Sequence, residues 1–180
     1  MSRINPLLAE TATGKTQVLF EQVKTKLGRV PNLMQTLGHS TSALAGYLSL
    51  NESLSQGTLS AKDRERIALT VAEHNGCGYC LAAHSAIGKM VGLNPSQIIE
   101  SRNGHASDSK ADALLQFVHR VLESNGQIDD SDLDQFLAEG YSEGEVAEVI
   151  AHISLSVLTN FFNNVAKTEI DFPKVEAVSV

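Results

Sequence analysis

The hydrophobic positions recur every three or four residues along almost the whole chain, the spacing that places them on one face of an α-helix. This pattern predicts helices in eight segments, which are 13–28, 41–57, 59–76, 77–91, 93–101, 109–126, 130–140 and 142–170. No stretch of strand length shows the alternation of hydrophobic and polar residues that a half-buried β-strand would have. The pattern therefore predicts an all-α fold.

Residues that start and end helices support these boundaries. Gly28 closes the first segment, and Ser60 with Asp63 forms a capping box at the start of the third. At the start of the fifth segment, Asn94 is a capping residue and Pro95 suits the first helical position. We therefore expect separate helices joined by short turns.

The longest segment, 142–170, carries apolar residues on more than one face. A helix of this kind is buried on several sides, either in the core of a domain or at a subunit interface. We expect one compact helical bundle over residues 1–170, with the core motif at 60–91. An extended tail is expected over 171–180.

Composition and charge exclude several kinds of partner. The chain is 42% hydrophobic and 19% charged, and its 14 Lys and Arg against 21 Asp and Glu give a net charge of -7. The basic residues form no cluster, so we expect neither nucleic acid nor an anionic membrane as a partner. The N-terminal segment lacks the apolar core of a signal peptide, and no segment suggests the roughly 20 apolar residues of a membrane span. These features predict a cytoplasmic protein.

The sequence GCGYCLAAH, residues 76–84, contains the most reactive side chains of the chain. On a helix, Cys77, Cys80 and His84 fall within about 60° of one another, so they face the same side. Two thiols at this spacing can form a disulfide, bind a metal or pack as small hydrophobes. The positive end of the helix dipole lowers the pKa of a thiol at a helix start, which by itself favours Cys77 as the more reactive thiol.

Glu65 lies in the middle of a face of small apolar residues on the preceding helix, formed by Ala61, Ala68, Leu69 and Ala72. A carboxylate on a buried face is costly unless it has a partner, and burial raises the pKa of a carboxyl group toward the range useful to a general base. Because only Asn75 and Gly76 join the two helices, we expect them to pack antiparallel. Glu65 would then reach Cys80 and His84, unless it pairs instead with a Lys or Arg across the interface.

Several of these residues allow other interpretations. His74, Cys77, Cys80 and His84 could be four zinc ligands, although a structural zinc site usually takes its ligand pairs from two separate elements. Tyr79 could pack or could donate a proton. A histidine on the long apolar helix, His152, is typical of a core histidine rather than a catalytic one.

The run from Glu65 to His84, ERIALTVAEHNGCGYCLAAH, resembles the carboxymuconolactone decarboxylase superfamily and, more closely, its AhpD-like alkylhydroperoxidase branch. That branch has a Glu twelve residues before a Cys-x-x-Cys and a His four residues after its second Cys, and Glu65, Cys77, Cys80 and His84 match these positions. One position departs from the pattern. The best-known AhpD enzymes have a His where this chain has Tyr79, and a phenol with a pKa near 10 is a much weaker base.

The segments 28–40 and 159–175 resemble the longer, peroxidase-related members of the same branch. The resemblance therefore extends over most of the chain and implies the same all-α fold. It also implies a homo-oligomer, either a trimer or a hexamer.

The resemblance implies a thiol-dependent peroxidase in antioxidant defence, with a hydroperoxide as substrate and a dithiol or protein as reductant. Cys80 would attack the peroxide bond to become a sulfenic acid, and Cys77 would resolve it to a disulfide. Glu65 and His84 would move the protons, Tyr79 is a further candidate catalytic residue, and no cofactor or metal is expected. The alternatives are acid/base chemistry on a lactone by Glu65 and His84, and a redox-sensing module without enzymatic activity.

Overall fold

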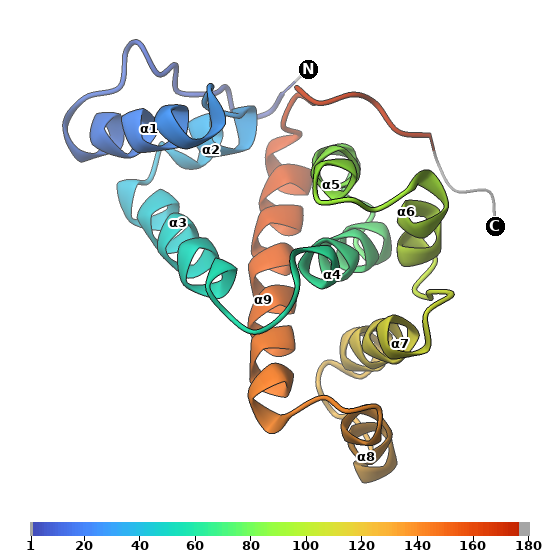
Figure 1. Cartoon of the computed structure of the whole chain (residues 1–180). Coiled ribbons are helices and arrows are strands. Elements are labelled where there is room, and N and C mark those ends of the chain that lie inside the picture. Colours follow the sequence, from blue (N-terminus) through green and yellow to red (C-terminus); the bar gives the residue numbers. More distant parts are fainter. Residues whose placement is uncertain (1, 177–180) are drawn as a thin grey trace.

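The structure, a computed structural model, describes residues 2–176, and every regular element within them is a helix (Figure 1). The helices are α1 (Gly14–Leu27), α2 (Asn32–Leu37), α3 (Thr41–Ser55), α4 (Ala61–His74), α5 (Gly78–Met90), α6 (Pro95–Arg102), α7 (Ser109–Ser124), α8 (Asp130–Ala138) and α9 (Glu143–Ala166). The predicted all-α fold is therefore confirmed.

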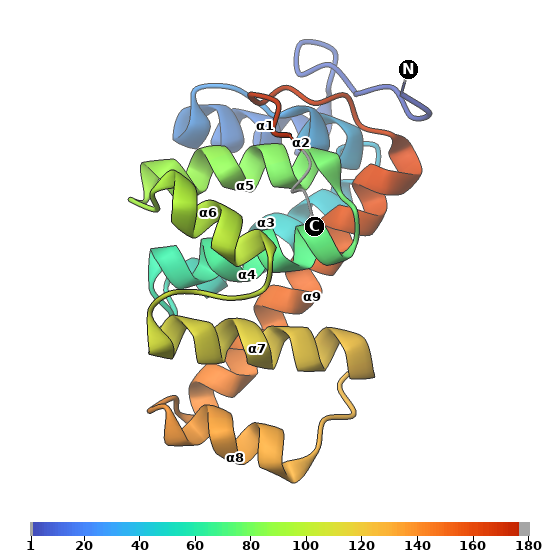
Figure 2. The same cartoon turned by 90° about the vertical axis from the view of Figure 1, so that its right-hand side faces the viewer.

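Helix α4 lies at the centre of the bundle, where it packs against α5, α6, α7 and α9. Figure 2 shows α5, α4, α7 and α8 stacked in this order, with α9 crossing behind them. One apolar cluster fills the space between α1, α2, α3 and the start of α5, and includes both cysteines. A second cluster lies between α4, α7, α8 and α9. The thiols thus lie in the first cluster, away from α7 and α8.

Both expected caps form, although the capping box predicted for Ser60 and Asp63 forms only in part, with the Asp63 carboxylate accepting from the Ser60 hydroxyl. The Ser60 side chain accepts a hydrogen bond from the Asp63 backbone N–H at 3.1 Å, and Asn94 forms a full capping box with Gln97. Gly28 adopts a φ of 74° at the end of α1, which a residue with a side chain would adopt only with strain. Helix α2 was not predicted, because it is a single short piece of six residues.

Helix α9 is shorter than predicted, since it ends at Ala166 and Lys167 takes the left-handed conformation with a φ of 49°. By length and composition alone, α9 is the one helix of the described residues that could cross a membrane. In the structure it instead packs on α2, α3, α4 and α5. Its buried face also includes polar residues such as Asn160 and Asn163, which make hydrogen bonds inside the bundle.

The chain beyond α9 runs back over the bundle in an extended conformation up to residue 176 (Figure 2). Asp171 forms an ion pair with Arg29 and accepts a hydrogen bond from the Asn32 backbone N–H, and Phe172 packs on the first apolar cluster. The described part of the tail is therefore attached to the bundle. The division at residue 170 stays a prediction, and residues 177–180 of the predicted tail lie outside the described residues.

Candidate active site

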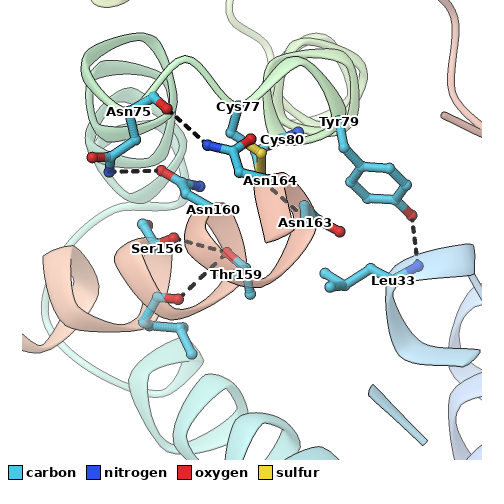
Figure 3. Close-up of a disulfide and its surroundings, with 11 residues drawn as sticks. Leu33, Asn75, Cys77, Tyr79, Cys80, Ser156, Thr159, Asn160, Asn163 and Asn164 are labelled. Atoms are coloured by element: carbon cyan, nitrogen blue, oxygen red, sulfur yellow. Dashed lines mark hydrogen bonds between the residues drawn. A yellow bond between two sulfur atoms is a disulfide. The ribbon is translucent and has the colours of Figure 1, made fainter. Parts of the chain in front are cut away.

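The two cysteines lie at the turn between α4 and α5. Gly76 reverses the chain with a φ of 61°, and the Cys77 backbone N–H donates to the Ala72 carbonyl at 2.9 Å. Cys77 is the capping residue of α5, and Cys80 lies within the first turn. Their sulfur atoms form a disulfide, with the Cα atoms 5.3 Å apart (Figure 3). The structure thus brings together the cysteine pair that the sequence singles out.

The two sulfurs differ in their surroundings. Cys77 is completely buried, and its Sγ accepts the Cys80 backbone N–H at 3.3 Å. Cys80 is also buried but forms part of the wall of a cavity, which Cys77 does not reach. The Asn163 amide of α9 donates to Cys80 Sγ at 3.3 Å (Figure 3). A small molecule in the cavity therefore meets Cys80 first.

Glu65 and His84 form an ion pair beside this cavity. Glu65 Oε2 lies 2.8 Å from His84 Nδ1, and only about a quarter of the His84 side chain is exposed. Burial alone lowers the pKa of His84, but the negative charge of Glu65 and its hydrogen bond together outweigh burial and raise that pKa above its ordinary value. The antiparallel packing of α4 on α5 that produces this pair is the arrangement expected from the short turn.

The cavity encloses about 150 Å³ between α2, α3, α4, α5, α9 and the tail. Most of its wall is apolar and includes Leu33, Met34, Ala68, Ala83, Ile87, Leu155 and Phe172. The polar part of the wall includes Tyr47, Arg64, Glu65, His84 and His152 together with Cys80. The sulfur of Cys80, a carboxylate–imidazole pair and an apolar space thus meet at one place.

Tyr79 has a defined structural role. Its hydroxyl donates to Asp171 Oδ1 at 2.8 Å and accepts the Leu33 backbone N–H at 3.2 Å. Burial, followed by the bond and charge of Asp171, raises the pKa of the Tyr79 phenol well above its ordinary value, so the phenol is neutral. Its ring also packs edge-on against Phe172. These contacts attach the tail over the site, while catalysis by Tyr79 stays a prediction.

Three features of the site could not be found from the sequence. Asn163 and the tail residue Phe172 come from segments far from the thiols along the chain, and no motif connects them. Tyr47 of α3 lies in the cavity wall near Glu65, and burial together with that negative charge raises the pKa of Tyr47 to about 12. Tyr47 is therefore a neutral hydroxyl at neutral pH.

The structure separates the four residues considered as zinc ligands. The His74 ring packs edge-on against His119 of α7, 6.3 Å between ring centres, while His84 binds Glu65. Among residues 2–176, no three side chains of His, Cys, Asp or Glu are grouped so as to hold a metal ion.

Comparisons with known proteins show what this chain is similar to. The profile of the carboxymuconolactone decarboxylase family matches residues 42–123, which contain both cysteines, Glu65 and His84. The crystal structure of an alkylhydroperoxidase AhpD core, an uncharacterized peroxidase-related protein from Ralstonia eutropha JMP134, superimposes with a TM-score of 0.85. It is 21% identical, over 94% of this chain and 92% of that one. No curated protein matches the sequence.

Two further structures share the fold. An uncharacterized peroxidase-related protein from Silicibacter sp. TM1040 has a TM-score of 0.80 at 22% identity, over 93% of this chain and 92% of its own. A variant of the debrominase Bmp8 in complex with 2,3,4-tribromopyrrole has a TM-score of 0.79 at 20% identity, over 95% of this chain and 92% of its own. Residues 42–123 are therefore similar to the carboxymuconolactone decarboxylase family, and the chain has the fold of the AhpD core.

The Glu65–His84 pair predicts a specific pH dependence. Because the folded pKa of His84 is raised, the stability gained from the pair is complete below the unfolded pKa of about 6.5 and is lost as the pH rises through the folded value. In Glu65→Gln only the effect of burial remains, so the pKa of His84 should fall below its ordinary value. Proton NMR titration of the His84 ring measures this change. The control is Glu73→Gln, which removes a carboxylate of the same helix that binds Arg102, and an equal change in both variants would contradict the assignment.

The Asn163 amide predicts an effect on thiol reactivity. In reduced protein carrying Cys77→Ser, this donor should stabilise the Cys80 thiolate, because hydrogen bonds to charged groups are the stronger ones. Asn163→Leu should slow the alkylation of Cys80 by iodoacetamide about tenfold at pH 7. At high pH the variant should react as fast as the parent protein, because the thiol then ionises without the hydrogen bond from Asn163.

The control for this experiment is Asn164→Leu. Asn164 donates to the Asn75 carbonyl at 2.9 Å and therefore holds the same turn, whereas Asn163 donates to the sulfur of Cys80. Similar rates for both variants would mean that Asn163 acts only by holding the turn.

Proposed function

We propose that this protein is a thiol-dependent peroxidase of the alkylhydroperoxidase type, in which Cys80 attacks and Cys77 resolves. The observation that carries the proposal is the position of Cys80. It lies in the wall of an apolar cavity beside the Glu65–His84 pair, while Cys77 is completely buried next to it. The fold shared with peroxidase-related proteins supports the same function.

The reaction proceeds in two steps on this geometry. The Cys80 thiolate attacks the outer oxygen of a hydroperoxide, so that the O–O bond breaks and Cys80 becomes a sulfenic acid. Protonated His84, held by Glu65, gives a proton to the alkoxide that leaves as an alcohol. The Cys77 thiol then displaces water from the sulfenic acid and forms the disulfide.

The cycle needs two electrons from outside the chain. An external dithiol or a reductant protein would attack the disulfide at Cys80, the sulfur that reaches the cavity. No organic cofactor takes part in these steps. A cytoplasmic location, where such reductants are plentiful, belongs to the same proposal.

Reductive dehalogenation of a small aromatic ring is a second candidate. The cavity, at about 150 Å³, has the size of an engineered protein cavity that binds benzene, and the structurally similar debrominase Bmp8 binds 2,3,4-tribromopyrrole. In this reaction a carbon–halogen bond is replaced by a carbon–hydrogen bond. A halide ion leaves, and the two thiols supply the two electrons by becoming a disulfide.

The two alternatives from the sequence are less well supported. Acid/base chemistry on a lactone would use the Glu65–His84 pair, but it would not need the cysteine that lies in the cavity wall, Cys80. A redox sensor without enzymatic activity would not need a carboxylate–imidazole pair beside the thiol. The experiments below distinguish both from a peroxidase.

We also propose that the chain forms a homo-oligomer, a trimer or a hexamer. Four apolar side chains are exposed along one side of α9, at positions three to eight residues apart: Ile150, Leu158, Phe161 and Val165. A stripe of this kind on a helix surface is typical of an interaction face.

The first prediction of this proposal concerns the two cysteines. After reduction and one equivalent of cumene hydroperoxide, Cys77→Ser should gain one oxygen by intact mass, because its sulfenic acid has no resolving thiol. Cys80→Ser should not change, since a serine hydroxyl is hardly ionised at neutral pH. The wild-type protein should lose two hydrogens as the disulfide forms.

Other outcomes of the same experiment lead to other conclusions. The opposite pattern in the two variants would exchange the roles of Cys77 and Cys80. An unreactive wild type that releases bromide from tribromopyrrole would favour the dehalogenase, and one inert to both compounds would favour the lactone enzyme or the sensor.

The second prediction concerns the oligomer. Phe161→Glu places a charge in the middle of the α9 stripe, and burying an unpaired charge in an interface is costly. Light scattering after size-exclusion chromatography should show a trimer or hexamer for the wild type and smaller species for the variant. An equally large change with Met90→Glu, which alters an exposed residue at the end of α5, would show that the effect is not specific to α9.

A further inference from the structure

We propose that the cavity binds a compact organic molecule with an anionic acidic group, which Arg64 and His152 hold. The inference rests on the proposed function to the extent that it names a substrate class for the same cavity. Both residues belong to the cavity wall, together with Cys80. The sequence indicated no role for Arg64 and a core position for His152.

Arg64 is a cation without a carboxylate partner among the described residues. The guanidinium groups of Arg66, Arg102 and Arg29 each bind a carboxylate, those of Asp63, Glu73 and Asp171. Arg64 instead makes one hydrogen bond, from Nη1 to the Leu59 carbonyl at 2.7 Å. A guanidinium has five N–H donors and binds carboxylates in a bidentate manner, so most of its capacity stays open to a ligand.

The acidic residues near Arg64 are already engaged. Glu65 binds His84 at 2.8 Å, and the Glu148 carboxylate accepts hydrogen bonds from the backbone N–H groups of Thr58 and Leu59. The positive charge of Arg64 therefore faces the cavity without a neighbouring carboxylate bonded to it. An anion entering the cavity would find this charge available.

His152 adds a second polar group without a partner. The residue is 8% exposed, and its Nε2 atom is buried with no hydrogen-bond partner in residues 2–176. Burial and the nearby charge of Arg64 lower the pKa of His152, so its ring is neutral and can donate one N–H. A buried polar atom without a partner is unfavourable by itself, and a bound ligand would satisfy it.

The rest of the cavity indicates the size and polarity of the non-acidic part of the ligand. Its walls are mainly apolar, and Leu33, Met34, Ile87 and Leu155 provide surfaces for carbon. The volume of about 150 Å³ suits one ring of the size of benzene. The geometry thus favours a monocyclic or short branched acid over a long lipid chain and over hydrogen peroxide itself.

Benzoate and its uncharged analogue benzamide test this inference without any turnover. In reduced protein, each compound is titrated at pH 7 and its protection of Cys80 against iodoacetamide is measured. Benzoate should bind on the order of tenfold more tightly than benzamide, because only the carboxylate pairs with the guanidinium. Equal binding of the two compounds, or binding of neither, would overturn the inference.

Variants show whether the two named residues are responsible. Arg64→Gln should abolish the preference for benzoate, Arg64→Lys should keep part of it, and His152→Leu should weaken the binding of benzoate. The control is Arg120→Gln, an exposed arginine of α7 that should leave the preference unchanged. A preference that persists in Arg64→Gln would overturn the inference.

The benzoate experiment and the hydroperoxide experiment can give different answers. A charge preference that depends on Arg64, in a protein that reduces no hydroperoxide, would support the acid site and contradict the peroxidase. Hydroperoxide turnover without the preference would support the peroxidase and contradict the acid site.

Discussion

The close antiparallel packing of α4 on α5 is the constraint on which the site depends. Small side chains at the contact, such as Ala68, Ala72 and Ala83, are buried and let the two helices approach closely. This approach brings Glu65 of one helix within hydrogen-bond distance of His84 of the other. A larger residue at Ala72, which is completely buried and is not part of the cavity wall, would push the helices apart, because packed interiors have little free space. The pair and the thiol turn would then lose their common geometry.

The turn between these helices is held from the outside by α9. Asn160 accepts a hydrogen bond from the Asn75 side chain, and Asn164 donates to the Asn75 carbonyl (Figure 3). Asn163, between them, reaches the sulfur of Cys80. Asparagine is costly to bury, so the two buried asparagines, Asn160 and Asn163, on the side of α9 that faces the cysteine turn indicate a task that apolar packing could not perform. Here that task is to fix the turn and to offer a donor to the sulfur.

The sequence predicted what depends on local spacing. Helix boundaries follow from apolar periodicity and capping residues, and the Glu65–His84 contact follows from a two-residue turn between two helices. It could not predict Asn163, which lies 83 residues from Cys80, because the crossing of α9 over the turn is set by the packing of the whole bundle. For the same reason, His152 was interpreted as an ordinary core histidine, although its Nε2 has no partner in the described residues.

The structure also addresses the conflict between two arguments about the thiols. The helix start favours Cys77, whose sulfur does accept a backbone N–H of the first turn. Stabilising a thiolate is not sufficient for attack, however, because the nucleophile must also reach the substrate, and Cys77 is completely buried outside the cavity wall. Cys80 lies in the cavity wall, accepts a hydrogen bond from the Asn163 side chain and has the Glu65–His84 pair beside the same cavity. A stabilised but inaccessible Cys77 thiolate instead suits a resolving role, since its only target is the adjacent sulfur of Cys80, to which it is bonded in the structure.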